Sequence, residues 1–264
     1  MIRLLKIEYR KQITSSGFWI LVVLHGVVIG LAAINFNSLL QNVNVMMNNV
    51  PDIDLALRPV LQFPDVWQNI TYISGFFKII LALILITSVC NEFTYSTARQ
   101  NIIDGLSRRE WLYSKIGLAI ALSLFSTLLV LSVGFVLGFS QEATVEPTAI
   151  FGRLDFVLAY FIELLVYFIY ALFLALALKR TGLSIILLLA YDFILEPIFS
   201  WSIPEYVNEF LPMNTIDNLN QFPFTKYVGN ETQSVVSIEQ LIWAVAYGTL
   251  FAVLSYFIFN KRDI

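Results

Sequence analysis

The chain has few of the residues on which most enzyme and metal sites depend. Its 264 residues include one cysteine, Cys90, and one histidine, His25. A single cysteine excludes an internal disulfide and a multi-cysteine metal site, and a single histidine excludes sites built on a histidine pair. No G-x-x-x-x-G-K-[ST], G-x-S-x-G or H-E-x-x-H motif occurs. We therefore expect a chain that is not an enzyme and that binds no metal or cofactor itself.

Charge is also scarce. Only 13% of the residues are charged and 58% are hydrophobic, with a mean hydropathy of +0.75. A soluble domain carries about a quarter charged residues, so the composition indicates an integral membrane protein. The net charge of -3 argues against nucleic acid as a partner.

Six apolar runs are each near the roughly 20 residues that cross the hydrocarbon core as a helix. They cover about Gly17–Ile34, Ile70–Cys90, Ile116–Phe139, Leu154–Leu178, Gly182–Trp201 and Ile238–Phe259. The predicted fold is an all-α integral membrane protein of six transmembrane helices, forming one domain over residues 1–264. A cleaved signal peptide is the alternative for the first run, but a long helical stretch precedes it and no small-residue cleavage site follows.

The positions of lysine and arginine predict the orientation. Twelve of the sixteen fall before the first run, after the second, after the fourth or after the last, and only three fall in the alternate loops. Because cytoplasmic loops collect Lys and Arg, both termini and residues 91–115 are expected in the cytoplasm, with the chain in a bacterial cytoplasmic membrane.

Three segments outside the runs have patterns of their own. Residues 1–16 alternate apolar and basic positions, which is typical of an amphipathic helix lying at the membrane surface in contact with lipid. Residues 35–69 are rich in asparagine and proline and predict an irregular external loop. Residues 202–237 predict short external helices before the last span, of the re-entrant kind that is tolerated where protein or a cavity covers it.

The polar segment from Asn91 to Lys115 carries the most specific local pattern. Apolar residues recur there at three- and four-residue spacing, which predicts a short helix with one apolar stripe; they are Tyr95, Ala98, Ile102 and Leu106. Gly105 is a suitable stop for that helix. Ser107 and Glu110 then form an S-x-x-E capping box, so a second helix is expected to begin near Arg108.

This segment resembles the cytoplasmic loop of ABC-2 type transporter permeases. The resemblance rests on an acidic residue, a threonine, a Gly-Leu-Ser-x-x-Glu turn and a lysine at the membrane, here Glu92, Thr97, residues 105–110 and Lys115. It implies a loop that docks onto a separate ABC ATPase subunit, which binds ATP and Mg, and a second permease copy or paralogue as partner. The residues expected to couple to the ATPase are Glu92, Tyr95, Thr97, Ala98, Ile102, Leu106, Arg108 and Arg109.

Four charged residues lie inside the predicted spans: Lys78, Glu163, Asp192 and Glu196. A charge at this depth is costly and usually faces a partner or water. Counting along the spans places Lys78, Glu163 and Glu196 at a similar depth, which predicts that Lys78 pairs with Glu163 or Glu196. The group lines a translocation pathway, locks three spans together, or relays protons.

The function predicted from the sequence is that of a permease subunit in an ABC-2 exporter driven by a partner's ATP hydrolysis. One alternative is an ion-coupled secondary transporter that uses the intramembrane charges. Another is a membrane scaffold or sensor without transport.

Overall fold

The computed structural model describes residues 2–35, 61–141, 146–223 and 235–261, and every regular element within these ranges is helical. In chain order the elements are α1 (Ile2–Ile13), α2 (Ser16–Ile34), α4 (Asp65–Gly75), α5 (Lys78–Thr94), α6 (Thr97–Ile103), α7 (Arg108–Gln141), α8 (Pro147–Phe151), α9 (Asp155–Leu178), α10 (Thr181–Ala190), η2 (Tyr191–Leu195), α11 (Glu196–Ser202), α12 (Glu205–Asn208), α13 (Pro212–Asp217), η3 (Asn218–Asn220) and α14 (Ile238–Lys261). The predicted all-α class is confirmed for the described part of the chain.

Five of the helical stretches are long and apolar enough to cross a membrane. They are Ser16–Ile34, Arg108–Ser140, Pro147–Leu178, Thr181–Ser202 and Ile238–Lys261. α4 and α5 are long and apolar enough for a sixth crossing only when they are taken together. The pair is bent by 46° where the two helices meet. The apolar runs of the sequence therefore correspond to real helices, while a count of six depends on this bent pair.

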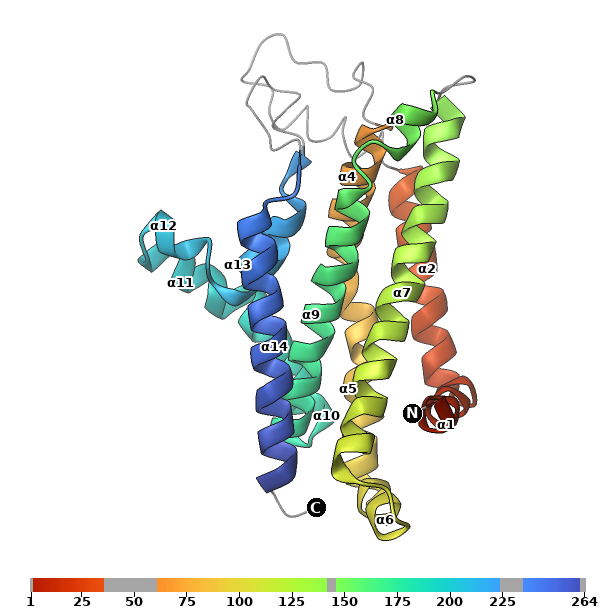
Figure 1. Cartoon of the computed structure of the whole chain (residues 1–264), viewed down its shortest axis with the longest axis vertical. Coiled ribbons are helices and arrows are strands. Elements are labelled where there is room, and N and C mark those ends of the chain that lie inside the picture. Colours follow the sequence, from red (N-terminus) through yellow and green to blue (C-terminus); the bar gives the residue numbers. More distant parts are fainter. Residues whose placement is uncertain (1, 36–60, 142–145, 224–234, 262–264) are drawn as a thin grey trace.

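The long helices stand side by side, with the short helices α6 and α8 at opposite ends of the bundle (Figure 1). α1 lies across one end of the bundle, beside the start of α2, and α6 and the carboxyl end of α14 are at the same end. This end is called the α6 end below. The opposite end, called the α8 end, carries α8 and the last turns of α7. The predicted surface helix over residues 1–16 is thus matched by α1, a separate helix at the α6 end.

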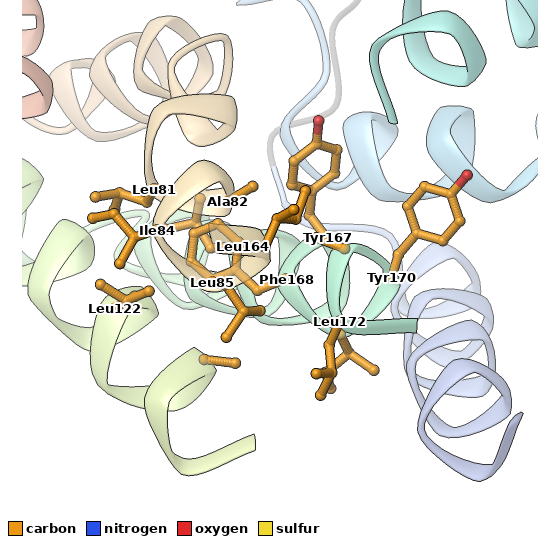
Figure 2. Packing of buried hydrophobic residues seen from close by; sticks show 14 of the residues in the cluster. Leu81, Ala82, Ile84, Leu85, Leu122, Leu164, Tyr167, Phe168, Tyr170 and Leu172 are labelled. Carbon is orange, nitrogen blue, oxygen red and sulfur yellow. The ribbon is translucent and has the colours of Figure 1, made fainter. Parts of the chain in front are cut away.

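Among the helices long enough to span a membrane, α9 is the most buried, and it forms the core of the bundle. Tyr167 and Phe168 lie on it and are fully buried. Figure 2 shows side chains of α5, such as Leu85, and Leu122 of α7 gathered around Phe168. Inside a membrane such contacts stabilise through close van der Waals packing, because lipid tails are as apolar as leucine.

Two glycines bring α4 and α7 into direct contact. A Cβ added at Gly134 would lie 2.6 Å from the ring of Trp67, and one added at Gly138 would overlap Phe63. The absence of a side chain at these positions lets the two aromatic rings pack against the backbone of α7.

The second predicted span differs from the structure in its first half. Its helix begins at Asp65 rather than near Ile70, and Phe76 and Phe77 interrupt it between α4 and α5. The cause lies in the neighbouring helix: a Cβ on Gly75 would be 2.8 Å from Oε1 of Glu163. Glycine at this point admits a carboxylate from α9 and weakens the helix locally. Most of the predicted irregular loop 35–69 lies outside the described residues.

The fifth predicted span is also irregular. After α10 the backbone makes one π-helical turn, η2, and continues as α11, with Pro197 in its first turn. Figure 1 shows α11 and α12 projecting sideways from the bundle, well below the level of α8. α13 and η3 then return to the bundle and bury Met213, Ile216 and Leu219. Short helices between residues 202 and 223 agree with the prediction, and residues 224–234 lie outside the described part.

Candidate functional site

The turn between α6 and α7 follows the local signals of the sequence closely. Gly105 has a positive φ of 99°, and the N–H of Leu106 donates to the carbonyl of Asn101 at 3.0 Å, as in a Schellman motif. Ser107 N–H donates to Oε2 of Glu110 at 3.0 Å, while the N–H of Glu110 donates to Oγ of Ser107 at 3.2 Å. Both the helix stop and the capping box are therefore confirmed.

The apolar stripe of α6 faces its own chain. Ala98 is fully buried, and Ile102 and Leu106 pack against the main core. Tyr95, which was also predicted to belong to the stripe, lies before α6 and is 74% exposed, and Ile103 on α6 is 71% exposed. The stripe, which was predicted to couple to a partner, therefore holds α6 on the bundle. The hydroxyl of Thr97 also donates a hydrogen bond to the backbone carbonyl of Glu92, at 3.4 Å.

The two arginines at the start of α7 contact α14. Nη1 of Arg108 donates to the carbonyls of Phe259 and Asn260 at 3.1 and 2.6 Å, which satisfies carbonyls that the end of α14 leaves open. Nε of Arg109 donates to the hydroxyl of Tyr256 at 3.1 Å. Both arginines were predicted to contact a partner ATPase. In the structure their side chains instead join the α6–α7 turn to α14.

Glu92 belongs to a buried network that joins α1, α5 and α7. Its carboxylate is 2% exposed and ion-pairs with Lys11 and Lys115, and Oε2 accepts a 2.6 Å hydrogen bond from Nε1 of Trp111. Lys115, with no exposed surface, also pairs with Glu8 of α1. The predicted role of Glu92 at a partner's rim does not fit this burial; the residue ties the surface helix to the bundle.

The sequence reasoning missed Glu8. It is the one acidic residue in the first 50, where basic residues dominate. A carboxylate in that setting is a signal for an internal cationic partner, and the partner is Lys115.

A groove of about 740 Å³ lies at the α6 end. α1 forms one wall with Ile7 and Glu8, and the α6–α7 turn forms the other with Asn101, Asp104 and Glu110. The groove therefore lies next to the buried network, since Glu8 and Glu92 also line it.

A second cluster of charges lies in the middle of the bundle. Nζ of Lys78, the first residue of α5, is 3.2 Å from Oε1 of Glu163 and also pairs with Asp217 of α13. The other oxygen of Glu163 accepts a 2.9 Å hydrogen bond from Asn220. The predicted pair of Lys78 with Glu163 is confirmed, whereas Asp217 was missed because its segment has the pattern of an external loop.

Asp192 and Glu196 are four residues apart but serve different partners. The hydroxyl of Tyr167 donates to Asp192 at 3.2 Å. Glu196 instead accepts from the backbone N–H groups of Met213 and Asn214, at 3.1 and 2.6 Å. It thereby caps α13, whose own N-cap residue, Leu211, has no polar side chain. Glu196 is thus a structural cap rather than an ion-pair partner of Lys78.

The central charges line a cavity of about 290 Å³. Lys78, Glu163, Asp192 and Asp217 contribute its charged groups, and the rest of the lining includes two asparagines and three aromatic side chains. Among the described residues no group of His, Cys, Asp or Glu is arranged to hold a metal ion. The mixture of charged and aromatic groups suits an organic group or water.

Comparison with protein families gives a match over residues 15–264, to the family described as "Protein of unknown function (DUF2705)". The chain belongs to the DUF2705 family. The DUF2705 match begins after α1 and includes both clusters except Glu8, Lys11 and Gln12. A comparison with curated proteins finds no match.

Proposed function

We propose that this DUF2705 chain is the membrane-spanning permease subunit of an ABC-2 type transporter. In this proposal it exports a substrate with energy from ATP, which a separate ATPase subunit binds with Mg and hydrolyses. A second copy or a paralogue completes the translocation unit. The chain lies in a bacterial cytoplasmic membrane with both termini in the cytoplasm.

The observation that carries the proposal is the construction of the α6 end. α6 is a short helix closed by a Schellman motif and a capping box, at the junction of α5 and α7. Ile103 of α6 and Tyr95, just before α6, are exposed, and other residues of the same turn line the groove of about 740 Å³. Exposed apolar side chains on a rigid turn are suited to docking a soluble protein.

The same end is linked rigidly to three further elements. Arg108 connects the turn to α14, and Lys115 connects α7 to α1 and α5. A partner that displaces α6 would therefore move α5, α7, α14 and α1 together. This supports a role for the turn in transmitting force from an ATPase.

Changing Ile103 to Asp is expected to weaken binding of the ATPase about tenfold or more, because it places a charge on the exposed apolar contact. Since Ile103 is 71% exposed, the bundle itself should keep its stability. The test is co-purification with a soluble P-loop ATPase expressed as the candidate subunit, together with ATP turnover in membranes.

Val235→Asp is the matched control, since Val235 is 64% exposed and lies before α14, at the opposite end of that helix. It should leave binding and turnover unchanged. A change within the apolar stripe, Ile102→Asp, is a poorer test because Ile102 packs on the chain's own core. Unchanged assembly and turnover with Ile103→Asp would exclude this docking surface.

The orientation is tested by cysteine labelling. Cys90 is fully buried and is replaced by serine, and a single cysteine is placed at Gln100, an exposed position on α6. An impermeant thiol reagent should label it in opened cells and leave it unlabelled in intact cells. Labelling in intact cells would place α6 outside and remove the ATPase proposal with it.

The central cavity favours a second candidate, an ion-coupled secondary transporter. One lysine and three carboxyl groups around a cavity of about 290 Å³ could exchange protons during transport. The two candidates differ in their energy source: transport by a secondary transporter would persist when the candidate ATPase is deleted and would stop when the proton gradient collapses.

A further inference from the structure

The cavity between α5, α9 and α13 has a charge imbalance. Its lining in the described part of the chain carries one ammonium group, Lys78, and three carboxyl groups, Glu163, Asp192 and Asp217. Lys78 is already paired with Glu163 and Asp217. Within the described residues no cation lies at ion-pair distance from Asp192, which accepts only the hydroxyl of Tyr167. A carboxylate in this position is costly unless a positive group joins it.

The walls of the cavity are suited to an apolar, partly aromatic body. Tyr72 and Phe76 lie at one side with their rings 5.3 Å apart and nearly perpendicular, and Phe193 lies at the other side. The faces of such rings attract cations, and their apolar surface accepts hydrocarbon. Lys78 already uses this attraction, since Nζ is 4.9 Å from the ring centre of Tyr167.

The backbone around the cavity is irregular on two sides. The break between α4 and α5 lies directly before Lys78, and the π-helical turn η2 contains Asp192 and Phe193. π-helical turns and interrupted membrane helices occur most often where a helix contributes to a binding site. Both irregularities border the same cavity. Their position supports a binding site independently of the charges in the cavity.

From these observations we propose that the cavity binds an organic cation, in which a compact ammonium group lies against Asp192 and an apolar or aromatic body contacts Tyr72, Phe76 and Phe193. This names the substrate class of the transporter and so rests on the proposed function. An anion is disfavoured because the only ammonium group of the described lining is already paired twice.

The experiment measures binding of two probes of similar shape and opposite charge to the purified, folded chain in lipid nanodiscs. The cation is benzyltrimethylammonium and the anion is phenylmethanesulfonate. The cation should bind saturably and raise the melting temperature, and the anion should not. Equal binding of both probes, or binding of neither, would overturn the proposal without any variant.

Asp192→Asn keeps the shape of the side chain and removes its charge, so it should weaken binding of the cation about tenfold or more. Glu239→Gln removes an exposed carboxylate at the start of α14 and should leave binding unchanged. An unchanged affinity in Asp192→Asn would refute the assigned site. Because this assay needs no ATPase, its failure is distinguishable from failure of the Ile103→Asp docking test.

Discussion

Replacing Lys115 by methionine is expected to lower the free energy of unfolding by about 3–5 kcal/mol. Lys115 has no exposed surface and pairs with both Glu8 and Glu92. Methionine fills a similar volume but carries no charge. The carboxylates of Glu8 and Glu92 would then remain close together with less positive charge to offset them. The measurement is thermal unfolding of the purified chain in detergent, followed by the fluorescence of its tryptophans, one of which, Trp111, is bonded to Glu92.

Lys261→Met is the matched control, because Lys261 is exposed at the end of α14 and should be replaced without loss of stability. Combining Lys115→Met with Glu92→Gln should recover part of the loss, since one of the unpaired carboxylates is then removed. If Lys115→Met unfolds at the same temperature as Lys261→Met, the buried network does not stabilise the junction of α1, α5 and α7.

Lys78→Met is expected to have the second-largest effect, again about 3–5 kcal/mol, because it removes the positive charge between Glu163 and Asp217. The structure predicts which second change restores stability. The side chain of Glu163 is 4% exposed, whereas that of Asp217 is 50% exposed and can be hydrated. Neutralising Glu163 should therefore recover more than neutralising Asp217.

The measurement compares three variants by thermal unfolding: Lys78→Met alone, with Glu163→Gln, and with Asp217→Asn. The glutamine introduced by Glu163→Gln would keep an oxygen that accepts from Asn220, as the carboxylate of Glu163 does at 2.9 Å. Two double variants no more stable than Lys78→Met would show that the pairs do not stabilise the bundle. Recovery that is larger with Asp217→Asn would reverse the assignment of the buried partner.

The parts of the fold that the sequence predicted well depend on residues close together in the chain. Gly105, Ser107 and Glu110 act within one turn of each other, so their spacing was enough to place the end of α6 and the start of α7. The apolar runs could likewise be recognised without knowing which helices pack against them. The stripe of Ala98 and Ile102 was found too, but periodicity cannot distinguish a face that covers its own bundle from one that binds a partner.

The charged sites could be predicted only in part because their partners are distant in the chain. Depth along the spans was enough to match Lys78 with Glu163, which are 85 residues apart. Depth along the spans could not identify Asp217, because no local pattern in the sequence shows that α13 returns to the bundle. Glu92 was recognised from its motif, but its burial depends on Lys11 of α1 and Lys115 of α7, which no local pattern links.

α5 connects the two charged clusters mechanically. Lys78 is its first residue and Glu92 lies near its last, so one straight helix carries a member of each charged cluster at each end. Fourteen residues at 1.5 Å each separate them by about 21 Å. A helix is stiff along its axis, whereas the break at Phe76 and Phe77 is a point where it bends. A displacement applied near Glu92 would therefore be transmitted along α5 to Lys78, and the bend before Lys78 would allow α4 to keep its position.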